Sequence, residues 1–133
     1  MNTNDHNGKR RSIAIDGLTH LTAIPVASRI GPLLVSSVIA PFNPGTRDVP
    51  DSIEAQYANI FRHVGLMLEE AGADWRHIAK MEFWTPTNDK GALDPFWLDK
   101  FPDEASRPAR HTHIGHGDSA RASFIAYVAD HTP

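Results

Sequence analysis

One amphipathic segment, residues 51–71, constrains the fold of this chain most strongly, because strand-like stretches lie on both sides of it. Its apolar residues recur at spacings of three and four, which predicts a helix with one buried stripe. They are Ile53, Tyr57, Ile60, Val64, Met67 or Leu68, and Ala71. Asp51 is the expected N-cap, with Glu54 in the capping-box position, and Gly72 is the expected stop.

Two apolar stretches before the helix predict strands. Ser12–Ile15 is short, and Ile30–Ala40 is a longer strand with Gly31-Pro32 at its entry. Because side chains alternate along a strand, one face of the longer strand is expected to carry four residues. These are Leu33, Val35, Ser37 and Ile39. The segment Pro41–Pro50 holds three prolines and a glycine and predicts a loop.

After the helix the chain predicts a strand over residues 77–85, a short aromatic helix at Asp94–Phe101, and two strands over residues 109–115 and 120–129. In the first of these strands Met81 and Phe83 face one way, and Glu82 and Trp84 face the other. The order of elements predicts one α+β domain over residues 12–133, with a mixed or antiparallel sheet and two helices on one face. The polar residues 1–11 are expected to form a disordered arm.

Composition excludes several classes of function. The net charge of −3 argues against a large nucleic-acid footprint. The chain has no cysteine, which excludes disulfides, thiolate nucleophiles and cysteine-based zinc sites. It has no secretory signal pattern and no apolar run of 18 residues. We therefore expect a cytoplasmic protein with neither a nucleic-acid nor a membrane partner.

The stretch "SRPARHTH" raises the question of what Arg110 does. If the last two strands pair around a two-residue turn at His116-Gly117, Arg110 lies opposite Ser123. Alternation then points His111 and His113 away from Arg110. A guanidinium fixed beside a hydroxyl is a good receptor for a carboxylate. The alternative is an exposed arginine or a structural ion pair.

The neighbouring histidines permit a metal-binding interpretation. His111 and His113 share one strand face, His116 follows at the turn, and Asp118 is available as a further ligand. Surface histidines at a strand end are the interpretation that the sequence favours, so we expect no metal and no cofactor. Trp84 is a candidate wall of a ligand pocket, and a core or interface position is its other interpretation.

Three motifs in order resemble the Rid family of reactive-intermediate deaminases, also called YjgF-like proteins. They are "IGPLLVSSVIAPFNPGTRDVP", the amphipathic helix ending "EEAGADWRHIAKMEFW", and "FPDEASRPARHTH" before the last apolar strand. The resemblance covers nearly the whole chain after the arm and indicates a divergent subgroup. It implies a chorismate-mutase-like α+β fold and a homotrimer whose three sheets form an inner barrel, with ligand sites in the clefts between subunits. Leu33, Val35 and Ile39 are compatible with facing such a barrel.

The resemblance also implies roles for particular residues. The arginine of the family's "PAR" motif matches Arg110 and holds the carboxylate of an enamine or imine acid. A serine lining the cleft matches Ser37, or Ser36 if the register slips by one residue. The glutamate that positions water in the last strand is replaced here by Ser123, which is a departure from the family pattern.

The loss of that glutamate leaves the catalytic base open. Serine is a poor base near neutral pH, although Ser123 can orient a water. By residue type, a substitute base could be His113, His111, His116, Glu82 or Asp94, from the same chain or from a neighbouring subunit.

We expect a hydrolytic deaminase acting on a small enamine, imine or amino-muconate-like carboxylic acid, which releases the oxo acid and ammonia. The alternative is a non-catalytic trimer that binds a small carboxylate and regulates a partner. A ribonuclease-like activity, which has been attributed to relatives, is less favoured because the chain lacks a basic stripe.

Overall fold

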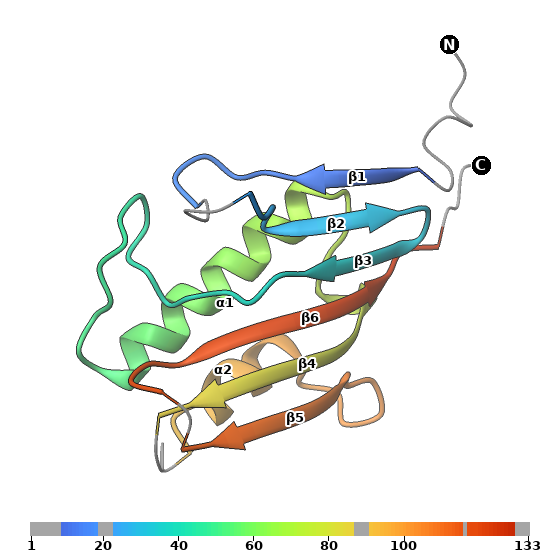
Figure 1. Ribbon diagram of the computed structural model, residues 1–133. Helices are drawn as coiled ribbons and strands as arrows, with labels where there is room; N and C mark the ends of the chain where they lie inside the picture. The colour runs from blue at the N-terminus through green and yellow to red at the C-terminus, as the bar shows by residue number, and fades with distance from the viewer. Residues whose placement is uncertain (1–8, 19–22, 87–90, 116, 130–133) are drawn as a thin grey trace.

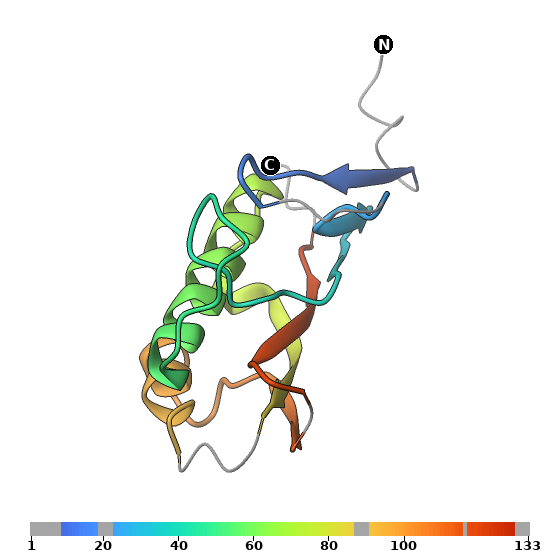
Figure 2. The ribbon, with the colours of Figure 1, turned by 60° about the vertical axis from the view of Figure 1, so that its left-hand side comes forward.

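In the computed structural model, the chain folds into a six-stranded sheet with its helices on one face (Figures 1 and 2). The structure describes residues 9–18, 23–86, 91–115 and 117–129. Its elements are β1 Arg10–Ile13, β2 Ala27–Ile30, β3 Leu33–Ser36, α1 Ile53–Glu70, the 3-10 turn η2 Trp75–His77, β4 Ile78–Thr85, α2 Asp94–Lys100, β5 Ala109–Ile114 and β6 Arg121–Tyr127. The strand order is β1-β2-β3-β6-β4-β5, and β4 and β5 run parallel while the other neighbours run antiparallel. The predicted α+β class, mixed sheet and two helices on one face are confirmed.

Helix α1 buries the predicted apolar stripe against the sheet. Tyr57, Ile60 and Val64 are fully buried within it. The N-cap is Ser52, whose Oγ accepts a hydrogen bond from the Ala55 amide at 3.1 Å, so the prediction of Asp51 was wrong by one residue. The predicted stop is confirmed, because Gly72 follows the C-cap with φ of +76°, a conformation that glycine adopts without a Cβ penalty.

The core lies between α1, α2 and the inner face of the sheet, which we define as the face toward the helices. The inner side chains of β3, β4 and β6 fill it: Leu34, Met81, Phe83, Phe124. Phe61 on α1 stacks on the ring of Phe83 with centroids 6.0 Å apart. Each such buried aromatic or aliphatic side chain contributes about 1.5–3 kcal/mol to folding. Met81 and Phe83 thus point where the sequence alternation predicted.

The segment predicted as one strand, Ile30–Ala40, is a hairpin followed by a loop. Gly31, with φ of +54°, and Pro32 form the turn between β2 and β3, which is the Gly-first geometry of a tight hairpin. β3 then ends at Ser36, and Ile39 makes an isolated bridge to Ala122 and is 2% exposed. The shared face predicted for Leu33 to Ile39 was therefore wrong beyond Val35, because the chain leaves the ladder.

The last two strands do not form the predicted hairpin. β4 lies between β5 and β6, so β5 pairs in parallel with β4, and β6 pairs antiparallel with β4 and β3. The physical reason is α2, which lies in the connection between β4 and β5; a crossover of this kind is what parallel neighbours require. His116, one of the two residues of the predicted turn, lies outside the described residues.

The first strand begins earlier than predicted. Arg10 and Arg11, which the sequence placed in a disordered arm, lie in β1 and pair with Ile30 and Arg29 of β2. The pairing extends inward to Ile13, which is 1% exposed in the core. Among the described residues, no helix combines the length and the apolar character needed to cross a membrane.

Candidate functional site

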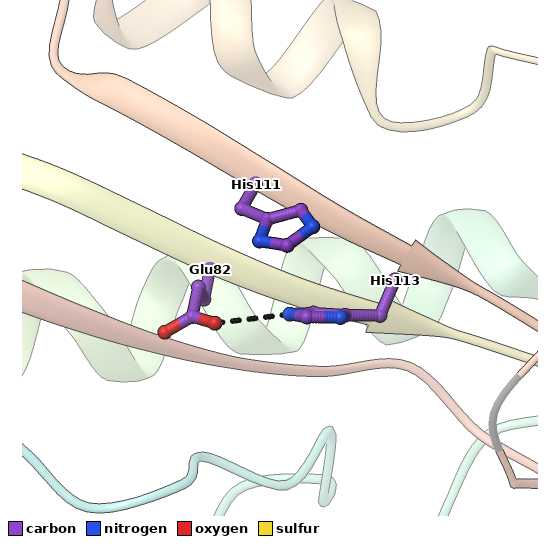
Figure 3. A group of neighbouring side chains, drawn as sticks. All are labelled: Glu82, His111 and His113. Carbon is purple, nitrogen blue, oxygen red and sulfur yellow. Dashed lines mark hydrogen bonds and ion pairs between the residues drawn. The ribbon is translucent and has the colours of Figure 1, made fainter.

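A cluster of one carboxylate and two imidazoles stands on the outer face of the sheet, the face away from α1 and α2. It consists of Glu82 on β4 and His111 and His113 on β5 (Figure 3). The parallel register sets Glu82 beside His111 and Trp84 beside His113. Met81 and Phe83 are buried in the core, so the alternating Glu82 and the side chains registered with it emerge on the opposite side.

A direct hydrogen bond joins two members of the cluster. Nε2 of His113 lies 2.9 Å from Oε2 of Glu82, and the two side chains are about a quarter and a third exposed. The rings of His111 and His113 are 4.0 Å apart between centroids. One donor atom from each of the three residues lies within 4.8 Å of the others. The group is therefore compact, partly shielded and open to a small ligand.

Hydrogen bonding favours the ionised form of the Glu82 carboxyl. The bond from His113 is the main cause that holds the pKa of the Glu82 carboxyl below its ordinary value, against a smaller opposing effect of burial. The Lys80 ammonium acts in the same direction as the bond, and so do the His113 and His111 rings when they are protonated. Glu82 is thus an ionised hydrogen-bond acceptor at neutral pH.

Trp84 fixes the position of His113. The two rings stack with centroids 5.1 Å apart and planes 8° from parallel. Arg121 on β6 pairs with Trp84, and its guanidinium lies 5.8 Å from the Trp84 ring centroid. Trp84 therefore lines the candidate site, on the face opposite Met81 and Phe83, as its alternation predicted.

Ser123 lies on the outer face directly across from Glu82. The antiparallel register of β4 and β6 pairs these two residues. Their Cβ atoms are thus expected about 4.5–5.5 Å apart on the same face. The resemblance predicts a water-positioning glutamate at the position of Ser123, and here the neighbouring strand carries Glu82 beside that serine.

Arg110 lies on the other side of the sheet from the cluster. Its guanidinium is 5.0 Å from the ring centroid of Trp97 and 3.8 Å from a carboxylate oxygen of Asp94, both on α2. Its registered partner is Met81, so the predicted pairing with Ser123 was wrong. The prediction that His111 and His113 point away from Arg110 is confirmed.

The two serines near the end of β3 use their hydroxyls within the chain. Oγ of Ser37 donates to the carbonyl of Pro25 at 2.7 Å. Oγ of Ser36 accepts from the amide of Phe124, the residue after Ser123, at 2.9 Å. Ser36 therefore joins the backbone next to the candidate site. A ligand-binding role for either serine stays a prediction.

An apolar pocket in the described part of the structure lies elsewhere. It has a volume of about 230 Å³ and is lined mainly by apolar side chains from α1 and from the segments before β2 and after β3: Leu18, Val26, Val38, Ile39, Ala40, Phe42, Arg47, Met67. It contains no residue of the cluster. The cluster instead lies on an open sheet face, so a ligand bound there would need a second surface to enclose it.

Sequence reasoning did not bring Glu82 together with the histidines. It named Glu82 as a base candidate by residue type and placed it on the face of Trp84, but it paired β5 with the wrong strand. The signal that could have found the cluster is the helix-containing connection at residues 86–108, which favours parallel pairing of the strands on either side. With that pairing, alternation alone would have set Glu82 beside His111.

No protein-family model and no curated protein matches the sequence, whereas solved structures match its fold. YyfA of the Rid protein family from Yersinia pestis has a TM-score of 0.81 and 21% identity, covering 90% of this chain and 100% of that chain. RidA from the Antarctic bacterium Psychrobacter sp. has a TM-score of 0.78 and 18% identity, covering 89% and 99%. A "probable translation initiation inhibitor" from Rhodopseudomonas palustris has a TM-score of 0.81 and 17% identity, covering 92% and 100%. The Rid-like fold implied by the resemblance is confirmed.

Proposed function

We propose that this Rid-like chain is a hydrolytic deaminase of a small enamine or imine carboxylic acid. The observation that carries the proposal is the cross-strand pair of Glu82 and Ser123 on the outer face of the sheet. The resemblance assigns the aiming of water to a glutamate at the position of Ser123. Here Glu82 supplies a carboxylate one strand away, and His113 orients that carboxylate by a 2.9 Å hydrogen bond.

The proposed chemistry has two steps. A water held by Glu82 attacks the protonated imine carbon, so that a carbon–oxygen bond forms and the carbon–nitrogen π pair moves to nitrogen. Glu82 accepts the proton that the water loses and returns it to the nitrogen. The nitrogen then leaves as ammonia, while the new hydroxyl gives its proton to the Glu82 carboxylate and becomes the carbonyl of the oxo acid. A positioned general base of this kind contributes about 10²–10⁴-fold to the rate.

In this proposal the substrate carboxylate is held by Arg110. A guanidinium offers a planar fork that grips a carboxylate in two places. Arg110 lies on the edge strand β5, where its ion pair with Asp94 is long, at 3.8 Å, and can give way to a ligand. Because its guanidinium lies across the sheet from Glu82, we place the complete site between two copies of the chain, with Arg110 from one and Glu82 from another.

We propose a homotrimer as the assembly that forms these clefts. An apolar patch on the outer face supports it: Leu33, Ile125 and Tyr127 are 43%, 43% and 60% exposed there. They are neighbours, because Leu33 pairs with Tyr127, and Ile125 lies two residues before Tyr127 on β6. Apolar residues grouped on a sheet face are typical of an interface. A second copy on this patch would also cover the cluster of Glu82, His111 and His113.

The experiment is ammonia release from a panel of unstable imino and amino-diene acids, with 2-aminoacrylate generated in situ and 2-aminomuconate included. We expect release above the spontaneous rate in the wild type and loss of the acceleration in Arg110→Ala. Arg76→Ala is the matched control, because the Arg76 side chain is 80% exposed on η2. If the acceleration were retained in Arg110→Ala and lost in Arg121→Ala, the residue that binds the substrate carboxylate would be Arg121, beside Trp84, and not Arg110.

A non-catalytic carboxylate-binding trimer is the second candidate, and the serine at position 123 favours it. The same panel separates the two functions. If a 2-oxo acid bound in an Arg110-dependent way and no member of the panel released ammonia, the protein would be a carboxylate-binding protein and not a deaminase.

A further inference from the structure

We propose that Glu82, His111 and His113 form a binding site for a divalent transition-metal ion of the zinc class. The site goes beyond the proposed deaminase, which requires no metal. It rests on the juxtaposition of three ligand-type side chains from two parallel strands on the outer face of the sheet (Figure 3).

The spacing of the ligands suits one ion. His111 and His113 are two residues apart on one strand face, and the carboxylate of Glu82 comes from the adjacent strand. Zinc binds imidazole nitrogen at about 2.0–2.1 Å and carboxylate oxygen at about 2.0–2.2 Å, so ligand atoms around it lie about 3.3 Å apart. The present donor atoms lie within 4.8 Å, and Glu82 and His113 are already 2.9 Å apart. Rotation of the His111 and Glu82 side chains about their broad terminal torsions closes the difference, while His113 keeps its stacked position.

The ligand types select the class of metal. Two neutral imidazoles and one carboxylate form the set found in sites with open coordination positions, and zinc and neighbouring transition metals favour it. Magnesium and calcium prefer oxygen ligands, so they fit poorly. Three protein ligands leave a coordination position for water, on a sheet face that is open to solvent in one chain.

The surroundings both support and limit the affinity. Stacking on Trp84 fixes the plane of the His113 ring before any ion arrives. The cations of Lys80, two residues before Glu82 on β4, and Arg121, beside Trp84, oppose the approach of a further positive charge. We therefore expect weaker binding than in a closed structural site with four ligands.

The test measures metal binding by the tag-free protein alone. Calorimetry with Zn²⁺ should give one ion per chain, and Co²⁺ should give visible absorption bands from protein ligands. His111→Ala and His113→Ala should each weaken Zn²⁺ binding by at least about tenfold, since loss of a ligand costs no less than loss of an outer-shell partner. Glu82→Gln should weaken it as well. His111 is exposed, so its variant is the one least able to disturb folding.

The matched control is His77→Gln, a histidine variant in η2, the turn that directly precedes β4, because His77 is not one of the three cluster residues. It should bind Zn²⁺ as the wild type does, and Zn²⁺ should raise the thermal midpoint of the wild type and of this control only. Equal Zn²⁺ affinity in the wild type, His111→Ala and His113→Ala, or no binding at all, would overturn the site. Ammonia release measured in excess chelator keeps the two proposals apart, because the deaminase needs no ion.

Discussion

Glu82 and Ser123 face each other directly across the antiparallel pair β4–β6, and both side chains stand on the sheet face away from the helices. A glutamate on β6 and a glutamate on β4 would therefore present their carboxylates to the same region. In the proposed mechanism, Glu82 thus supplies a carboxylate in this region while position 123 carries a serine.

This relationship predicts a rescue. In the Glu82→Gln background, Ser123→Glu should restore a measurable part of the ammonia release, because it returns a carboxylate to the same face one strand away. Ser123→Gln in that background is the matched control and should restore none. The measurement is the rate of ammonia release at saturating substrate. Two equally inactive double variants would contradict the idea that a carboxylate at position 123 can replace that of Glu82.

Removing His113 should change the titration of Glu82. The hydrogen bond from His113 is the main cause of the lowered pKa of the Glu82 carboxyl, so in His113→Ala that pKa should rise toward its ordinary value. Carboxyl-carbon NMR titration measures it directly. A group whose pKa is lowered in the folded state stabilises the fold above its unfolded pKa, and this contribution disappears as the pH falls through the folded pKa. An unchanged Glu82 titration in His113→Ala would show that the bond is absent in solution.

His63 should make the protein acid-sensitive. Burial is the main cause that lowers its pKa from 6.5, and its Nε2 lies 2.7 Å from the Phe42 carbonyl, which fixes a neutral ring that donates there. The unfolded chain binds a proton at higher pH than the folded chain, so stability contributed by neutral His63 is complete above about pH 6.5 and falls as the pH drops below it. Unfolding by urea at several pH values should show this slope, and His63→Gln should flatten it. A wild-type slope retained in His63→Gln would assign the acid sensitivity to other groups.

The tight turn at Gly31 predicts a local cost of substitution. Its φ of +54° is unfavourable for a residue with a Cβ, so Gly31→Ala should lower the free energy of unfolding by about 1–2 kcal/mol. Denaturant unfolding measures the change. Gly65→Ala is the comparison, since it lies inside α1, where alanine is the better helix former, and its new Cβ would meet Trp75 only at 3.7 Å. A Gly31→Ala protein as stable as the wild type would contradict the strained turn.

The outer apolar patch should control assembly. Tyr127→Lys should shift the protein from trimer to monomer, because it places a charge in the proposed interface. Leu98→Lys is the matched control: Leu98 is a similarly exposed apolar residue, at 48%, but it lies on α2 on the helix side of the sheet. Light scattering after size-exclusion chromatography measures the mass. A wild type that runs as a monomer at micromolar concentration would contradict the trimer.

Local patterns in the sequence predicted the elements well. The apolar stripe of α1 and the alternation along β4 depend on neighbours within a few residues, and both are confirmed. The sequence predicts Ile30–Ala40 as one strand because apolar residues lie on both sides of Gly31-Pro32. In the structure, these two residues form the turn between β2 and β3. Local composition does not distinguish a strand that enters at a Gly-Pro pair from two strands that turn there.

Pairing of strands was the part that the sequence did not determine. Alternation correctly set His111 and His113 opposite to Arg110, but the partner of β5 depends on contacts far along the chain. The assumption that consecutive strands form a hairpin put Arg110 beside Ser123, whereas the α2 crossover sets β5 on the far side of β4. The cluster with Glu82 follows from that one nonlocal choice.

The most direct test of the account is the rate of ammonia release by the wild type and by Glu82→Gln, with 2-aminoacrylate generated in situ. The account predicts acceleration over the spontaneous rate in the wild type and a loss of about 10²–10⁴-fold of it in the variant, since the amide accepts no proton from water. A Glu82→Gln protein that is folded and releases ammonia as fast as the wild type would show that the carboxylate beside Ser123 does not aim the water.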